Sequence, residues 1–478
     1  MADLIRPTDI DFWWHLKTGE LIFQTHAVPM TDPFSYTVFG QPWTAHEWLW
    51  ELAIYGLYRI GGFALAALVS AAIVTLTYVV VYRLLRRLGV NEFVAVALVV
   101  WAAVMAMPSI GVRPREVTAL FFAIYLSRIY LYREGSIRTL WLLPLLMLLW
   151  VNLHGPFILG LTILGLFVLI ETARWLARQA PFPRHLWIVG ALTLAATVVN
   201  PRGPAMLLYP LTYYTQGSNP SFAVVSEFRS PDFHDPLYLG FGVSLVLLMV
   251  LPAGRARRSS HALFDALLLV AFALLALISY RNVPEYALVA APQLADRLRD
   301  RFAIARELSP VPMRPRAALL NMALLAVIVL GAGTFVATQP WLLARFQLHG
   351  EPLAQEMPVG GATYIEQHSL PGPVFNEQAW GGYLIYRWYP QRRVFIDGRV
   401  DIYGPEVVRD YLELVNVGPS WRQILEKYGI ETVLISKGSP LSTLLLASGE
   451  WKRVYQGPVE DVFVRRGLSA SGHSQRIE

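Results

Sequence analysis

The sequence has 478 residues, of which 55% are hydrophobic and only 15% are charged. A soluble protein of this length needs more charged residues on its surface, and long apolar blocks such as those here indicate membrane-spanning helices. The absence of cysteine excludes disulfides, thiolate nucleophiles and cysteine-ligated metals. The net charge of +6 comes from basic residues beside apolar runs, which is typical of topology-setting charges and gives no support to nucleic-acid binding.

Residues 1–62 are polar and aromatic, and we expect them to form an extracytoplasmic loop. Leu16–Phe23 and Glu47–Tyr58 can each form an amphipathic helix lying on the membrane. The clustered tryptophans of this segment are typical of side chains that lie at the lipid headgroups. No apolar segment precedes the loop in this sequence, so we favour the interpretation that a first helix lies upstream of Met1; the alternative is that the short N-terminus crosses the membrane unaided.

Residues 63–338 are expected to form a transmembrane domain of about ten spans. The apolar runs cover approximately 63–82, 92–112, 116–133, 139–153, 156–173, 187–199, 237–252, 262–280, 283–296 and 317–338. Arginine clusters follow alternate spans, which places those loops in the cytoplasm. The opposite loops, 113–115, 154–155, 200–236 and 281–282, then lie outside together with residues 1–62 and the C-terminal tail.

The tail, residues 339–478, has a different pattern. Strand-like runs at Val394–Ile396 and Thr432–Ile435 alternate with helical stretches such as Pro419–Tyr428, and glycines and prolines separate them. This pattern predicts a small α/β domain. The fold class expected is therefore a polytopic α-helical membrane protein with a small extracytoplasmic α/β domain at its C-terminus.

Acidic and histidine side chains gather in the first outer loop. They are Asp9, Asp11, His15, His46, Glu47 and Glu51, with Lys17 as the neighbouring cation. Carboxylates beside a membrane cost free energy unless they have partners or a function. Asp9 and Asp11 could bind a divalent cation such as Mg²⁺ or Mn²⁺ through hard oxygens, or one acid could serve as a general base. A solvated loop, with Asp9 as a helix N-cap, is the structural alternative.

Several arginines of the outer loops break the distribution that sets topology. They are Arg113, Arg115, Arg202, Arg229 and Arg281. Arg113 and Arg281 each follow an apolar run, where a guanidinium can bind a phosphate in a bidentate manner. The alternative is that these side chains reach toward lipid headgroups. His154 lies at a predicted outer turn, where it either stabilises the turn or, as we favour, lines a substrate cavity.

Segments along the whole chain resemble bacterial membrane proteins of the GT-C glycosyltransferase superfamily. In the first loop these are Asp9–Gly19, Val28–Thr37 and His46–Leu49; further segments are Trp150–Gly155, Asn200–Gly203, Glu227–Phe233, Arg281–Pro284, Trp380–Leu384 and Phe395–Arg399. The resemblance implies a polyprenyl-phosphate-linked sugar donor and a cell-envelope acceptor that meet at the outer face of the bacterial plasma (inner) membrane. It also implies a first outer loop that follows a transmembrane helix and carries the catalytic acid.

The resemblance thus implies specific roles for the polar side chains. Asp11 is the first candidate for the base, followed by Asp9 and Glu47. Substrate contacts are expected from His15, His46, Arg113, His154, Arg202 and Arg281. The partners expected are the lipid-linked donor and membrane lipids, and protein partners are compatible with this assignment.

The sequence is also compatible with two other functions. The first is a scaffold or assembly subunit that has the same architecture without catalysing a reaction. The second is a transporter or glycan polymerase, which is disfavoured because core spans such as 63–82 and 317–338 lack ionisable residues.

Overall fold

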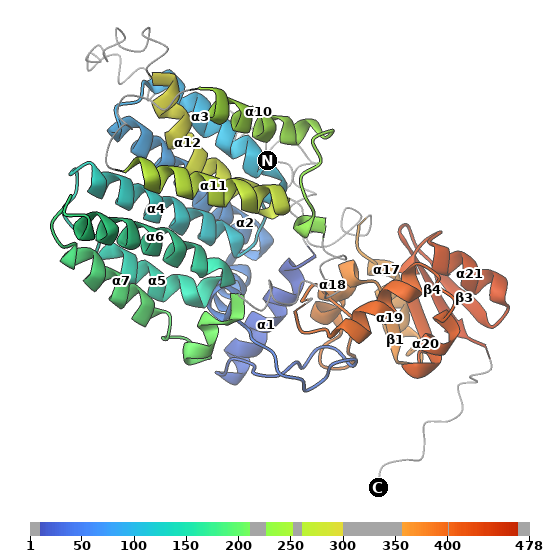
Figure 1. Ribbon diagram of the computed structural model, residues 1–478. Coiled ribbons are helices and arrows are strands. Elements are labelled where there is room, and N and C mark those ends of the chain that lie inside the picture. The colour runs from blue at the N-terminus through green and yellow to red at the C-terminus, as the bar shows by residue number, and fades with distance from the viewer. Residues whose placement is uncertain (1–9, 211–225, 252–260, 300–355, 400, 467–478) are drawn as a thin grey trace, which may run out of the picture. The chain divides into compact units, whose positions relative to one another are not determined.

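The computed structural model describes residues 10–210, 226–251, 261–299, 356–399 and 401–466, and Figure 1 shows their helices and strands. The chain divides into two compact units. Among the described residues, a helical unit comprises 64–210, 226–251 and 261–299, and a loop–tail unit comprises 10–63, 356–399 and 401–466. The predicted first loop therefore folds together with the C-terminal tail, although the helical unit separates them in the sequence.

The helical unit follows the apolar runs of the sequence. Its helices are the second part of α2 (Trp48–Arg87), α3 (Glu92–Ala106), α4 (Arg115–Arg133), α5 (Leu142–Leu153), α6 (Ile158–Leu176), α7 (Arg184–Ala196), α10 (Pro236–Val250), α11 (Ala262–Ile278) and α12 (Val283–Arg299), with short 3-10 helices η2 (Met107–Ser109), η3 (Gly155–Phe157), η4 (Gly203–Leu207), η5 (Ser226–Phe228) and η7 (Tyr280–Asn282). Each predicted span from 63–82 to 283–296 coincides with a helix. The span predicted at 317–338 lies outside the described residues.

Helix α2 consists of two helices joined at a pair of glycines. Gly61 has φ −143° and ψ 21°, and Gly62 has φ +63° and ψ −162°, so both leave the helical region. A positive φ is open to glycine at little steric cost. The break coincides with the predicted end of the first loop at residue 62 and with the boundary between the two units.

Within the described residues, three helical segments are long and apolar enough to cross a membrane. They are Trp48–Arg87, Glu92–Ser109 and Gly155–Leu176. Shorter apolar helices are Leu142–Leu153, Arg184–Ala196, Pro236–Val250 and Ala262–Ile278. The number of spans that meet this criterion is smaller than the predicted number, because many apolar helices here are shorter than the roughly 20 residues that cross a bilayer upright.

Helices α4 and α12 lie at the centre of the helical unit. Helix α12 packs against α3, α10, α11 and α4, and its Ala287, Ala290 and Ala291 side chains are fully buried. Small side chains allow neighbouring helices to approach closely. Helix α4 is buried on most sides and carries the buried charges Arg115 and Glu116. Both helices therefore present polar residues to other helices of this unit, which explains why they are less apolar than their neighbours.

The loop–tail unit is built around a four-stranded mixed sheet. Its elements are α1 (Phe12–Thr25), the first part of α2, α17 (Val359–Gln367), β1 (Val374–Asn376), α18 (Gln378–Trp388), α19 (Pro405–Val415), α20 (Trp421–Lys427), β2 (Thr432–Ser436), α21 (Pro440–Ser448), β3 (Trp451–Gln456) and β4 (Glu460–Arg465). The strand order is β1-β2-β4-β3. Strand β1 pairs with β2 in parallel, with Phe375 opposite Val433, and the other pairs are antiparallel.

The sequence correctly predicted β2 and α20 but placed a strand wrongly at Val394–Ile396. In the structure only Val394 forms an isolated bridge, and its partner is Ser35 of the first loop. The Asn376 side chain forms hydrogen bonds with the backbone of this segment. Its amide nitrogen donates to the Ile396 carbonyl at 2.8 Å, and its oxygen accepts from the Phe395 amide at 2.8 Å. A side-chain amide thus replaces a neighbouring strand.

Four of the five tryptophans of the first loop form part of a protein core, which corrects the expectation that they lie at lipid headgroups. Trp13, Trp14, Trp43 and Trp50 are buried. The Trp13 ring contacts those of Tyr383 and Tyr386 in α18 at 5.4 and 5.0 Å between ring centroids. Helix α1 therefore uses its aromatic face to pack on α18 of the tail.

Candidate functional site

The first candidate site begins at the N-terminus of α1. Asp11 occupies the N-cap position, and its backbone oxygen accepts from the His15 amide at 3.2 Å, so these two residues lie one helical turn apart, as predicted. The Asp11 carboxylate accepts a hydrogen bond from the Trp14 indole nitrogen at 3.1 Å. Asp11 is half-buried, which gives its carboxylate a defined position. Asp9 lies outside the described residues.

His15 lies between two carboxylates that come from the start of α2. Its Nδ1 is 3.4 Å from Glu51 Oε1, and its Nε2 is 3.6 Å from Glu47 Oε2. Burial lowers the pKa of His15, but the hydrogen bond with Glu51 and the charge of Glu47 outweigh burial and raise this pKa above its usual value. Glu47 and Glu51 therefore have a histidine partner, while Lys17 pairs with Glu20 at 2.9 Å.

His46 extends this group of charges. Its Nε2 lies 3.4 Å from the other oxygen of Glu47, Oε1, and its Nδ1 is 3.1 Å from the Thr44 carbonyl oxygen. Burial opposes the charged form, but the negative charge of Glu47 raises the pKa of His46 to about 9. Glu47 thus links His15 and His46, and one oxygen of the buried Glu51, Oε2, has no hydrogen-bond partner among the residues that the structure describes. We call His15, His46, Glu47 and Glu51 the histidine–glutamate cluster.

The second candidate site lies within the helical unit and joins two of the predicted outer arginines. Arg113 Nη1 is 2.7 Å from Glu227 Oε1, and Arg281 Nη1 is 3.9 Å from Glu227 Oε2. Burial raises the pKa of Glu227, but the positive charges of Arg281 and Arg113 outweigh burial and lower this pKa to about 2. We call Arg113, Glu227 and Arg281 the arginine–glutamate group. A carboxylate that bridges two guanidiniums marks a position where an anion is stabilised.

Arg115 supports this group from a more buried position. Its Nη2 is 3.2 Å from Glu285 Oε2, with both side chains buried, and it also donates to the backbone oxygen of Arg281. Arg115 therefore fixes the backbone of Arg281, one of the two arginines that contact Glu227. The sequence pattern identified the arginines but neither glutamate, because the sequence separations of 114 and 170 residues carry no periodic signal.

The remaining predicted contacts lie elsewhere in the helical unit. His154 is buried, and its Nδ1 is 2.7 Å from Thr118 Oγ1, which also accepts from the Trp150 indole at 2.8 Å. His154 therefore joins α4 to the end of α5. The Arg202 amide donates to the Asn200 side chain at 2.8 Å within a turn.

The metal hypothesis finds no donor set in the described part of the chain. Nowhere among these residues do three or more His, Asp or Glu side chains have an arrangement that could hold a metal ion. Glu47 and Glu51 lie beside His15, whose raised pKa favours a cation that competes for the same oxygens. The Asp9–Asp11 metal site stays a prediction, because Asp9 lies outside the described residues.

Solved structures of other proteins show which fold the chain has. No family model and no curated protein matches the chain. The archaeal oligosaccharyltransferase AglB from Archaeoglobus fulgidus, solved with an inhibitory peptide and a dolichol-phosphate, matches with a TM-score of 0.56 and 14% identity over 89% of this chain and 65% of that chain. The apo form of the Archaeoglobus fulgidus oligosaccharyltransferase gives a TM-score of 0.57 and 15% identity over 90% and 66%. The chain has the GT-C fold.

A more distant match is ArnT from Cupriavidus metallidurans bound to undecaprenyl phosphate. Its TM-score is 0.43, with 16% identity over 96% of this chain and 95% of that chain. The chain spans about two thirds of the length of the oligosaccharyltransferase, 65–66%. At these identities the likeness establishes architecture, and the chemistry has to be argued from the residues of this chain.

Proposed function

We propose that the protein is a membrane glycosyltransferase that transfers a sugar from a polyprenyl-phosphate donor to a cell-envelope acceptor. In this proposal it spans the bacterial inner membrane about ten times, with the loop–tail unit on the outer face. The GT-C fold supports the reaction class. The observation that carries the proposal further is the first loop itself, in which a half-buried carboxylate, Asp11, is held one helical turn from His15.

The proposed reaction is a single displacement with inversion at the sugar. Asp11 accepts the proton of the acceptor hydroxyl, and the resulting oxygen attacks the anomeric carbon. The bond between that carbon and the phosphate oxygen breaks, and the electron pair leaves with the polyprenyl phosphate. Negative charge develops on this phosphate as it leaves. Separately, Arg113 and Arg281 of the helical unit are proposed to bind a lipid phosphate. His15 and the histidine–glutamate cluster hold the start of α1, on which Asp11 lies.

The test is sugar transfer from a labelled polyprenyl-phosphate sugar, measured with purified full-length protein in lipid nanodiscs. Asp11→Asn is expected to lower kcat by roughly 10²- to 10⁴-fold, the usual contribution of a general base. The matched control is Glu20→Gln, which removes a carboxylate from the same helix that is ion-paired with Lys17. Full activity of Asp11→Asn would refute the role of Asp11, and a wild-type protein that is correctly inserted but transfers no sugar would favour a scaffold instead.

A further inference from the structure

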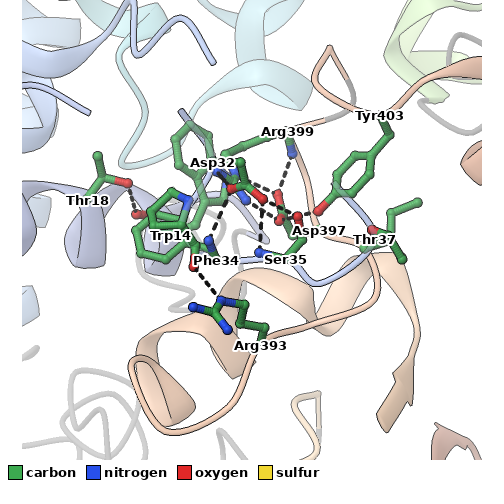
Figure 2. A network of polar contacts seen from close by, with 12 residues as sticks. Trp14, Thr18, Asp32, Phe34, Ser35, Thr37, Arg393, Asp397, Arg399 and Tyr403 are labelled. Atoms are coloured by element: carbon green, nitrogen blue, oxygen red, sulfur yellow. Dashed lines mark hydrogen bonds and ion pairs between the residues drawn. The ribbon is translucent and has the colours of Figure 1, made fainter. Parts of the chain in front are cut away.

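The tail segment 397–399 contacts the first loop through a buried network of charges, shown in Figure 2. Arg399 Nη1 is 2.8 Å from Asp32 Oδ1 in the first loop, and Arg399 Nη2 is 2.6 Å from Asp397 Oδ2. The Tyr403 hydroxyl donates to the same Asp397 oxygen at 2.6 Å. The side chains of Asp32, Asp397 and Arg399 are at most 1% exposed. One loop carboxylate and one tail carboxylate therefore share a single guanidinium out of contact with water.

In the first loop, Asp32 is also held by hydrogen bonds from the residues that follow it. The two oxygens of Asp32 accept from the backbone amides of Phe34 and Ser35 at 3.2 and 3.0 Å, and the Ser35 hydroxyl also donates to Asp32. The Arg399 guanidinium lies over the Trp43 ring, 4.6 Å from its centroid. These contacts determine both the shape of the loop and its place on the tail. Removing Arg399 would leave two buried carboxylates without their cation.

Between the two charged residues of this segment, Gly398 lies directly against Asp11. A Cβ atom built on Gly398 would overlap Asp11 Oδ1 and would lie 3.3 Å from Trp14 Nε1. Gly382 makes the same kind of approach, because a Cβ atom there would overlap the Ile10 carbonyl oxygen. Glycine is the residue that allows a backbone to approach this closely. The Asp11 carboxylate is thus confined between the Trp14 indole and the backbone of residue 398.

We propose that the segment Asp397-Gly398-Arg399 positions the catalytic carboxylate, so that Gly398 is a positioning residue for Asp11. This inference rests on the proposed function and assigns a role to the tail. The buried pairing of Arg399 with Asp32 holds segment and loop together, and the missing side chain at 398 leaves the space that Asp11 occupies. Displacing the carboxylate by about 1 Å is enough to lower turnover on the order of 100-fold, without altering how the donor binds.

The test is Gly398→Ala in the full-length protein, with kcat and the KM for the donor measured per folded molecule. The expected result is a loss in kcat of about 100-fold with an unchanged donor KM. The matched control is Gly404→Ala, which lies six residues further along; it has φ −66°, and a Cβ atom there meets nothing within 4 Å. Wild-type kcat in Gly398→Ala overturns the inference, as does an equal loss in both alanine variants.

A second measurement covers the outcome that Gly398→Ala folds poorly. The thermal midpoint is compared between Gly398→Ala alone and Gly398→Ala combined with Asp11→Ala, each against its own parent. If the added methyl group acts on the Asp11 carboxylate, the destabilisation shrinks once that carboxylate is removed. An equal destabilisation in both backgrounds overturns the inference. If instead Asp11→Asn retains full activity, the proposed base fails, whatever Gly398→Ala does.

Discussion

Replacing Glu227 by glutamine should strengthen the binding of a lipid phosphate. The Glu227 carboxylate lies 2.7 Å from Arg113 and 3.9 Å from Arg281, and its low pKa of about 2 keeps it charged at neutral pH. A phosphate that uses both arginines must displace this carboxylate. Each pair is about a quarter exposed, so each contributes up to about 1 kcal/mol. Losing both competing contacts corresponds to about 1–2 kcal/mol, or roughly 5- to 30-fold tighter binding.

The assay is the dissociation constant of a short-chain polyprenyl phosphate, measured by calorimetry on detergent-solubilised protein at about 0.1 M salt, where charges interact over ~10 Å. The matched control is Glu92→Gln, which removes one exposed carboxylate from the start of α3. High salt should narrow the difference between wild type and Glu227→Gln. An unchanged dissociation constant would refute the competition argument, and weaker binding would mean that Glu227 orients the arginines for the phosphate.

Two further predictions concern the loop–tail unit. Arg399→Met should lower the free energy of unfolding by about 3–5 kcal/mol, because it leaves buried carboxylates unpaired. The control Arg422→Met breaks a half-exposed pair with Glu450 and should lower the same free energy by less than about 1 kcal/mol. Equal shifts of the denaturant midpoint in the two variants would contradict this prediction. The pKa of His46 is raised to about 9 in the folded protein, so its stabilisation is complete below the unfolded pKa of about 6.5 and disappears as the pH rises through 9, a loss of up to about 3 kcal/mol. His46→Gln should flatten the decline in unfolding free energy between these pH values, and an unchanged slope would exclude His46 as its source.

The sequence predicted the helices of the helical unit from their apolar runs. Apolar runs locate a helix wherever they are long, and every predicted span up to 283–296 is helical. Apolarity alone does not distinguish a helix against lipid from one buried among other helices. Helix α12, whose alanines are fully buried, illustrates this. The strand predicted at Val394–Ile396 failed because the Asn376 amide took the backbone groups that a neighbouring strand would have paired.

The candidate sites were predicted in part. Outer arginines stand out because they break the charge pattern of the loops, and two of them, Arg113 and Arg281, share Glu227. The partner itself could not be predicted, because which acid meets which arginine depends on how distant helices pack. In the same way the loop acids were visible in the sequence, but the position of His15 between Glu47 and Glu51 follows from the packing of α1 on α2. A backbone contact at Gly19 allows that packing, since a Cβ atom there would overlap the Glu51 carbonyl oxygen.

Three of the segments that resemble the GT-C superfamily contact one another in the structure, although they lie far apart in the sequence. The first-loop segment around Asp11 and Trp14 packs against Gly382 and Gly398 of the two tail segments. Asp32, in another of the resembling segments, pairs with Arg399. These segments therefore occur together because each needs the others in order to be buried. It follows that packing accounts for Gly382 and Arg399, whereas Gly398 also leaves the space in which the half-buried carboxylate of Asp11 lies. A change that affected packing alone would lower stability and leave kcat per folded molecule unchanged, whereas Gly398→Ala is expected to lower kcat itself.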